Sequence, residues 1–385
     1  MARLGDVCTI VSGTTPKSGH PEYWDGDINW VTPAELTDES DTVFESQRKI
    51  TQQAVSDSSL KPFPAGTVLL SSRAPIGKVA IAGVEMYCNQ GFKNLICSDV
   101  IYNRYLYHFL KGKTDYLNSL GRGATFKEIS KSIVEGIEIP LPALDEQRKI
   151  AAVLDKVSDL IVKRRQQLDK MDEIAKARFV DMFGDPETNT KNWRVLPMSK
   201  ICSVGSSKRI YQSEQSSSGV PFWRISDLTN LITTGTVNPA LYIPEERYKE
   251  LKTQGQVPAP GDILITSRGT LGQCYIVKEE DKFYFQDGMI SWLSGYMDGV
   301  TSLYISYLFA MSGFRKQIDA TQAGSTVAYL SIAMIKKLKV MLPDLESQQQ
   351  FAFAVEQIEK TKTTISRSLG KLETLKKALM QEYFG

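Results

Sequence analysis

The chain has 385 residues, of which 42% are hydrophobic and 23% are charged, and its formal net charge is +2 at pH 7. This length and apolar content predict roughly two to three domains with their own cores. No segment approaches the ~20 unbroken apolar residues of a membrane helix, and the N-terminal residues lack a signal peptide's long apolar region. We therefore expect a soluble, cytoplasmic protein.

The charge is distributed evenly along the chain, with net values of −2, +1, +3 and 0 for residues 1–144, 145–184, 185–343 and 344–385. No segment has the strong basic bias of a free-standing nucleic-acid binder, or the acidic bias of a DNA mimic. Five scattered cysteines without a CxxC pair predict reduced thiols rather than disulfides or a zinc site.

Short runs of β-branched and aromatic residues bounded by Gly, Pro or Ser predict strands in both halves of the chain. These runs lie at 67–72, 79–84, 262–267, 273–278 and 282–287. Residues 103–120 and 303–318 instead space their leucines and aromatic residues at helical intervals, which predicts core helices rather than base-stacking surfaces. The globular parts are therefore predicted to be mixed α/β.

A long helix is predicted after the first globular part. The chain from Asp145 to Phe183 contains no Gly or Pro, and most of its apolar residues recur at steps of three and four. At ~1.5 Å per residue the run is on the order of 55 Å long. This apolar stripe is typical of a helix that packs against another helix, and it consists of Ile150, Leu154, Val157, Ile161, Leu168, Met171 and Ala175.

The second half of the chain repeats the first. A shift of 201 positions places ARFVDMFG (177–184) on ALMQEYFG (378–385) and LPALDEQ (141–147) on LPDLESQ (342–348). With small slips, the SSRAPIGK stretch around Arg73 also matches the TSRGTLGQ stretch around Arg268. A repeat of this length is a whole domain with its connector, written twice.

The repeat predicts a second long helix whose apolar face consists of Phe351, Val355, Ile358, Ile365, Leu369, Leu372, Leu375 and Leu379. Two long helices with equivalent faces most simply bury each other as an antiparallel coiled coil. The alternative is two separate amphipathic helices, each lying on its own domain. We predict globular domains at 1–144 and 185–343, and helices at 145–184 and 344–385.

Catalytic and metal-binding motifs are sparse. Two histidines, His20 and His108, exclude a histidine metal cluster and make a His-dependent hydrolase improbable, and no Gly-rich phosphate loop with GK[ST] occurs. Asp262 with Glu280 and Lys282 is the nearest approach to a metal-dependent nuclease site. A charged hairpin turn explains the same residues, so we interpret the chain as a binding and positioning protein.

These motifs together resemble those of a known family. The helix-opening PLPALDEQRKIAAVLDKVSDLI, the helix-closing ARFVDMFGD, the repeated SRxxxG loops and the two diverged domains between similar helices resemble the specificity subunit of Type I restriction-modification systems. The resemblance covers essentially the whole chain.

The resemblance implies a non-catalytic DNA-recognition subunit. Each globular domain is then a target recognition domain that reads one half of a bipartite, asymmetric sequence in double-stranded DNA, and the antiparallel helices fix the unread spacer. The helices also dock two modification subunits that methylate adenine, and restriction subunits join that core. By this resemblance no cofactor belongs to the chain itself, because S-adenosylmethionine, ATP and Mg²⁺ are expected in the partner subunits.

Candidate base-reading residues follow from chemistry. Arg73 and Arg268 lie in equivalent Gly-bounded loops after a strand, and arginine is the usual bidentate reader of guanine or a phosphate clamp. The alternative is a structural arginine that bonds loop carbonyls. Lys78 and its equivalent Gln273 are candidates for contacts to phosphate and adenine, respectively, with an exposed side chain of no role as the alternative.

Two Gly-rich segments are further candidates. Gly123 with Thr125, and Gly324 with Thr326, offer backbone N–H groups and a hydroxyl to phosphate. A simple entry into a helix with a Ser or Thr N-cap explains them as well. The remaining candidate DNA contacts are the loop cations Lys17, Lys93, Lys208, Arg209 and Arg224.

For partner docking we name Gln147, Arg148 and Gln348, near the starts of the two helices. The second helix departs modestly from the first here, with SQQQ at 347–350 where the first has EQRK at 146–149. A different class of function also fits the sequence: a non-catalytic coiled-coil adaptor whose two globular ends grip protein partners.

Overall fold

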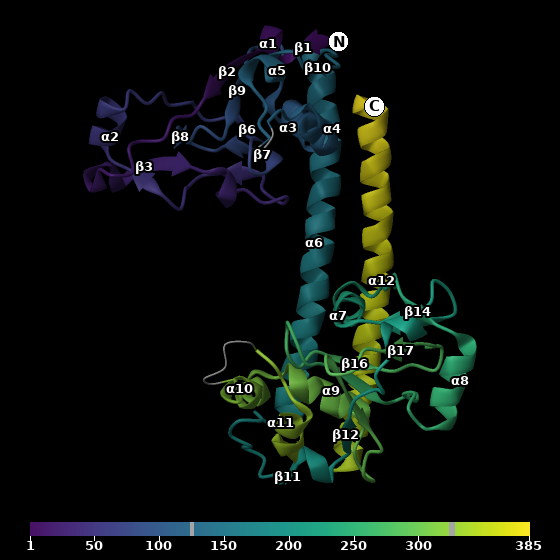
Figure 1. Cartoon of the computed structure of the whole chain (residues 1–385). Helices are drawn as coiled ribbons and strands as arrows, with labels where there is room; N and C mark the ends of the chain where they lie inside the picture. Colours follow the sequence, from purple (N-terminus) through teal and green to yellow (C-terminus); the bar gives the residue numbers. More distant parts are fainter. Residues whose placement is uncertain (124–126, 323–327) are drawn as a thin grey trace. The chain divides into compact units, whose positions relative to one another are not determined.

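The computed structural model describes residues 1–123, 127–322 and 328–385, shown in Figure 1. The chain divides into two compact units, one of residues 1–165 with 366–385 and the other of residues 166–365. Each unit therefore contains one globular part together with a stretch of both long helices. In the described parts of the chain, none of the helices has the length and apolarity that crossing a bilayer requires.

The first unit contains a five-stranded sheet of order β2-β9-β6-β7-β4, a three-stranded sheet of order β5-β3-β8 and the pair β1-β10. The β3–β8 and β4–β7 pairs are parallel and the others are antiparallel. Its strands are β1 (Ala2–Arg3), β2 (Cys8–Ser12), β3 (Trp24–Val31), β4 (Thr42–Val43), β5 (Lys49–Ile50), β6 (Val68–Ser72), β7 (Ile76–Ala82), β8 (Tyr87–Cys88), β9 (Lys93–Cys97) and β10 (Glu138–Ile139). Its short helices are α1 (Leu4–Val7), α2 (Gln52–Asp57), α3 (Asn103–Lys111), α4 (Thr114–Leu120) and α5 (Lys131–Glu135).

The second unit contains a four-stranded sheet of order β12-β18-β15-β16, a three-stranded sheet of order β14-β13-β17 and the pair β11-β19. Its strands are β11 (Arg194–Pro197), β12 (Ser203–Gly205), β13 (Val220–Trp223), β14 (Tyr242–Ile243), β15 (Ile263–Thr266), β16 (Cys274–Ile276), β17 (Tyr284–Phe285), β18 (Ile290–Ser294) and β19 (Lys339–Leu342). Its short helices are α7 (Ile225–Thr234), α8 (Glu245–Thr253), α9 (Ser302–Ala310), α10 (Ser312–Ala320) and α11 (Ile332–Lys337).

The two units share one topology. The order β12-β18-β15-β16 matches β2-β9-β6-β7, and in each three-stranded sheet the central strand has one antiparallel and one parallel neighbour. The chain following Leu36 leads to β4 at the edge of the first sheet, whereas the chain around the equivalent Leu228 forms α7. The predicted internal repeat and the mixed α/β class are thus confirmed.

The long helices α6 (Leu144–Phe183) and α12 (Leu345–Phe384) run through both units. In the first unit, Ile150 and Leu154 near the start of α6 share a core with Phe384 at the end of α12. In the second unit, Phe179 and Phe183 at the end of α6 share a core with Phe351 near the start of α12. Within each unit the helix segments therefore run antiparallel, as predicted.

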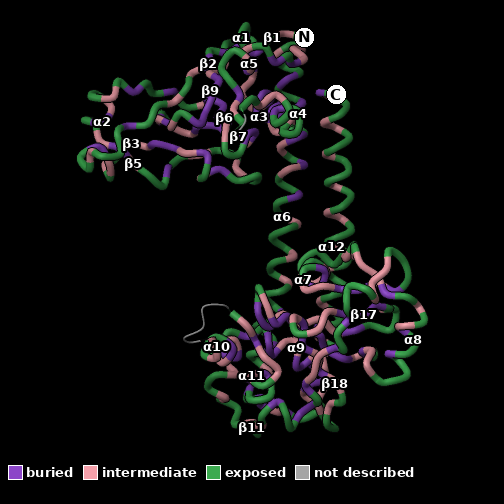
Figure 2. Tube along the Cα trace, in the orientation of Figure 1, coloured by how far each residue is buried: buried purple, intermediate pink, exposed green. Residues whose placement is uncertain are grey.

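The burial of the helix faces follows the predicted stripes with exceptions (Figure 2). Ile150, Leu154 and Ala175 are buried, but Leu168 and Met171 are only half-buried. Leu375 was predicted on the apolar face of α12 and is 47% exposed, so that position was wrong. A narrow contact between two helices covers fewer positions than a stripe on a globular domain, which explains the difference.

Candidate functional site

The loop between β6 and β7 is held by one hydroxyl. The Ser71 Oγ accepts a hydrogen bond from the Lys78 N–H at 2.8 Å and donates to the Pro75 carbonyl at 2.8 Å. Gly77, with φ +93°, adopts a backbone conformation that a side chain disfavours. Arg73 is carried at the start of this loop, directly after β6.

The equivalent loop between β15 and β16 is built in the same way. The Thr266 Oγ1 accepts from the Gln273 N–H at 3.0 Å and donates to the Thr270 carbonyl. Gly272 has φ +72°. Arg268 follows β15 as Arg73 follows β6, so the duplication extends to individual hydrogen bonds. We call these two segments, 71–78 and 266–273, the Ser/Arg loops.

Both Ser/Arg loops are hydrogen-bonded to the segment that leads into the last short helix before a long one, α5 before α6 and α11 before α12. The Ser72 carbonyl accepts from the Ile129 N–H at 3.0 Å, and the Ser267 carbonyl accepts from the Leu330 N–H at 3.1 Å. The next residue in each copy is a serine that caps the helix, α5 in the first unit and α11 in the second. The Gly-rich candidates precede these bonds: Gly123 has φ +130°, whereas Thr125, Gly324 and Thr326 lie outside the described residues.

In the first unit Arg73, Lys78 and Lys93 are engaged by protein groups. The Glu128 carboxylate lies 3.9 Å from Arg73 Nη1 and 3.2 Å from Lys93 Nζ. Lys93 is buried, which assigns it to the core of this loop rather than to the surface. Lys78 Nζ donates to the Leu36 carbonyl.

In the second unit the equivalent groups have spare hydrogen-bonding capacity. The Arg268 guanidinium lies over the Tyr329 ring, 4.8 Å from its centroid. Considering only the residues that the structure describes, Arg268 Nε and Gln273 Oε1 are buried without a hydrogen-bond partner. Buried polar atoms normally have partners, so these two atoms differ from the engaged side chains of the first loop.

The remaining candidate cations lie at several places on the two units. Lys17 and Lys208 are exposed, and Arg209 Nε lies 2.9 Å from an Asp287 carboxylate oxygen. Arg224 precedes α7, where its own N–H donates to Asp227 at 2.8 Å. Within the first unit the structure therefore gathers Arg73 and Lys93 around one carboxylate.

The two glutamines predicted for partner docking are buried. Gln147 accepts from the Tyr102 N–H at 2.8 Å, and Gln348 accepts from the Thr301 N–H at 2.9 Å. Each amide also donates to two backbone carbonyls of its own unit. These amides join the start of a long helix to its globular part, so neither contributes to a docking surface in this structure. Arg148 is exposed, with its guanidinium 5.8 Å from the centroid of the Tyr102 ring.

Asp262 and Lys282, considered for a nuclease site, are engaged by other groups of the protein. The Asp262 carboxylate accepts from Trp292 Nε1 and from the Ala259 N–H, both at 2.8 Å, and burial raises its pKa. Lys282 pairs with Glu245 at 2.8 Å. Among residues 1–123, 127–322 and 328–385 there is no group of three or more His, Cys, Asp or Glu side chains able to hold a metal ion.

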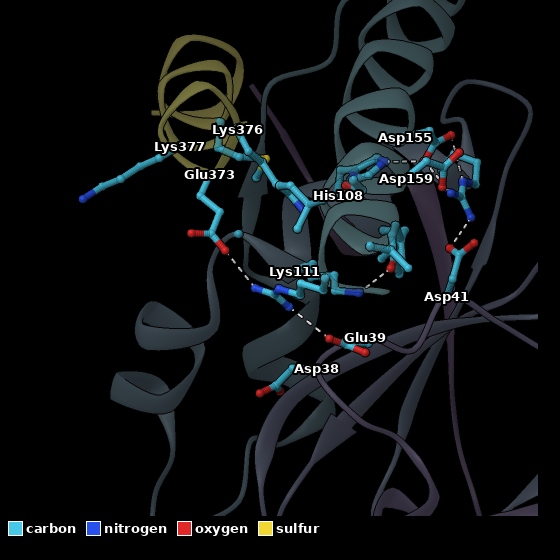
Figure 3. A pocket seen from close by; sticks show the side chains of 18 of the residues that line it. Asp38, Glu39, Asp41, His108, Lys111, Asp155, Asp159, Glu373, Lys376 and Lys377 are labelled. Carbon is cyan, nitrogen blue, oxygen red and sulfur yellow. Dashed lines mark hydrogen bonds and ion pairs between the residues drawn. The ribbon is translucent and has the colours of Figure 1, made fainter. Parts of the chain in front are cut away.

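A charged cavity in the first unit escaped the sequence interpretation (Figure 3). It is lined by residues of α3, α6 and α12 and by the chain preceding β4, and it includes His108 and Asp155. Burial lowers the pKa of His108, although Asp155 opposes this effect. These residues are 47 positions apart in sequence, and no motif connects them.

Comparison with known proteins gives the family. The sequence matches the family described as "Type I restriction modification DNA specificity domain" over residues 1–170 and 190–377. The chain belongs to this family. It is 30% identical over 400 residues to the Type I restriction enzyme MjaIX specificity subunit of Methanocaldococcus jannaschii, covering 98% of this chain and 90% of that protein.

Two solved structures share the fold of this specificity-family chain. An S subunit of the Type I restriction-modification system from M. genitalium aligns with a TM-score of 0.57 at 15% identity, covering 100% of this chain and 95% of that one. A chain from a study of complex assembly and conformational transition of the type I R-M system aligns with a TM-score of 0.60 at 17% identity, covering 100% and 96%.

Proposed function

We propose that this chain is the sequence-recognition subunit of a Type I restriction-modification complex, and that each globular part reads one half of a bipartite, asymmetric DNA target. The observation that carries the proposal is the pair of Ser/Arg loops. Two domains of one topology present the same loop, with an arginine at the same place and different residues around it. One chain thus offers two related but different DNA-reading surfaces, whereas a symmetric dimeric DNA-binding protein offers two identical ones.

The proposed readers are the Arg73 and Arg268 guanidinium groups, supported by Lys78 and Gln273. An arginine in a loop held by hydrogen bonds to the backbone can present its guanidinium in a defined orientation. From there it can donate two hydrogen bonds to guanine or to a phosphate. Gly123, Thr125, Gly324 and Thr326, with Lys17, Lys208, Arg209 and Arg224, are proposed as phosphate contacts. Lys93 supports the first loop through Glu128.

The long helices are proposed to set the spacer between the half-sites and to dock two adenine methyltransferase subunits. Arg148 is the proposed docking residue, because its side chain is exposed. The chain is proposed to be non-catalytic, with S-adenosylmethionine, ATP and Mg²⁺ bound by the methyltransferase and restriction subunits. A one-heptad insertion in both helices should lengthen the spacer by about three base pairs, because ~10 Å of helix matches about three base-pair rises.

Methylome sequencing tests the proposal. A host without Type I systems is made to express this chain with the modification subunit encoded beside it, and its methyladenine is mapped. A new bipartite motif with methyladenine in both halves is expected, and replacing residues 185–343 should change one half only. A soluble complex that adds no motif would instead support a coiled-coil adaptor that grips protein partners.

A further inference from the structure

The charged cavity of the first unit is lined by residues outside the Ser/Arg loop of that unit and has a volume of about 860 Å³. Asp155 on α6 joins α3 to the long helix there. Arg104 donates to the Asp155 carboxylate through Nε at 3.2 Å and through Nη2, and His108 Nε2 lies 2.6 Å from the same carboxylate. Burial disfavours the charged Asp155, but the hydrogen bonds from His108 and Arg104 prevail and lower its pKa. An ionised carboxylate therefore connects the two helices.

Side chains of α3 also bind residues 38–41. We call this segment the edge loop, because it leads directly into the edge strand β4. Arg104 forms a second ion pair, with Asp41. Tyr107 Oη and Lys111 Nζ each donate to the Ser40 carbonyl at 2.8 Å. Three side chains of α3 thus bind the edge loop.

Arg165 extends this attachment to both long helices. Its Nη1 donates to Glu39 of the edge loop at 3.0 Å, and its Nη2 donates to Glu373 of α12 at 2.9 Å (Figure 3). Arg165 therefore forms ion pairs with the globular part and with the other long helix at once. Because the edge loop continues into β4, which pairs with β7, its position is coupled to the sheet that carries the first Ser/Arg loop.

Among its described residues the second unit has an ion pair between the long helices, Lys362 Nζ with Asp172 at 2.8 Å, but none that joins α9 to either long helix. The hydrogen bonds of Gln147 and Gln348 align α3 with α9 and α6 with α12. In that alignment Arg104, Tyr107, His108, Lys111 and Asp155 correspond to Leu303, Ser306, Tyr307, Ala310 and Glu356. Glu356 pairs with Lys360 of its own helix at 2.7 Å, and the Tyr307 ring packs against Phe351, with 5.0 Å between centroids.

We propose that Arg165, Glu39 and the Asp155 ion pairs form a positioning site that fixes the first recognition domain on the long helices and so sharpens the choice of spacer length. Arg165 acts as a positioning residue, because it contacts the edge loop and α12 rather than a reading loop. The inference rests on the proposed function, since it assigns to this site a role in reading a bipartite target. Its chemistry predicts that ion pairs hold α3 and the edge loop on the long helices in the first unit, whereas apolar contacts hold α9 in the second.

The test uses charge reversal and rescue in the complex with the modification subunit. In R165E, three carboxylates (positions 39, 165 and 373) are brought together, whereas in E39R/R165E an arginine at position 39 faces Glu373 and the new glutamate. The control K360E makes the same charge change in the Lys360–Glu356 pair, which lies within one helix. Methylation rates are measured on duplexes that carry the native spacer or a spacer one base pair longer or shorter.

We expect R165E to lower the preference for the native spacer by about two- to fivefold, the range for a partly exposed ion pair, with an unchanged thermal midpoint. E39R/R165E should restore the preference, and K360E should leave it intact. Equal preferences in R165E and the wild type, or no rescue by the double variant, would overturn the positioning role. A wild-type complex that methylates no bipartite motif would instead refute the proposed function, so the two failures are distinguishable.

Discussion

The two Ser/Arg loops have the same backbone frame but different surroundings. In the first unit, Glu128 lies beside Arg73 and Lys93, and the Leu36 carbonyl binds Lys78. In the second unit, Arg268 stacks on Tyr329. A frame held by a buried hydroxyl can be duplicated and then diverge at its side chains without loss of the loop. The difference predicts that the second loop contributes more binding energy and the first loop more internal stability.

The largest expected effect is on DNA binding by the second loop. R268A should weaken binding of the assembled complex to its target by about 1–3 kcal/mol, the range for a bidentate base contact. R73A should cost less, because Arg73 is already attracted by Glu128 in the free protein. Titration of labelled duplex at fixed salt measures both, and an equal or larger loss in R73A would remove the proposed asymmetry.

The second prediction concerns the stability of the first loop. E128Q should lower the free energy of unfolding by about 1–3 kcal/mol, because it leaves the buried Lys93 ammonium without its carboxylate. Urea unfolding measures the change, and E280Q in the charged turn after β16 is the matched control. Because Glu128 also faces Arg73, E128Q should at the same time strengthen binding to DNA. A variant as stable as the wild type would show that Lys93 does not depend on this pair.

A smaller effect should separate Lys78 from Gln273. K78M should destabilise the chain by about 1 kcal/mol, since it leaves the Leu36 carbonyl without this donor, and should change DNA binding little. For Q273A we expect weaker binding to DNA and little change in stability. The Gln273 amide oxygen has no hydrogen-bond partner among the described residues, so its removal breaks no described bond. Thermal unfolding and duplex titration on the same two preparations decide this, and parallel changes in both quantities would contradict it.

The sequence predicted what is periodic or repeated. The apolar steps located α6 and α12, and the internal repeat, followed upstream with small slips, located the two Ser/Arg loops. It did not predict that Gln147 and Gln348 are buried, since a polar residue near a helix start gives no sign of the carbonyls that will surround it. The attachment through Arg104, Asp155 and Arg165 was also missed, because its partners come from distant segments and are joined only by the fold.

The smallest expected effect uses the difference between His108 and its counterpart Tyr307. Burial lowers the pKa of His108 below its ordinary value of 6.5, with Arg104 and Lys376 acting in the same direction and Asp155 opposing. Below about pH 6.5 the unfolded chain therefore binds a proton that the folded chain does not, so stability falls as the pH decreases. The lowered pKa of Asp155 also makes stability fall as the pH decreases. That contribution is lost only near and below its ordinary pKa of 3.8. Urea unfolding between pH 7.5 and 5 should show a steeper loss for the wild type than for H108Q, whereas Y307F should keep the wild-type slope. Parallel slopes in wild type and H108Q would mean that His108 does not titrate differently in the folded and unfolded chains.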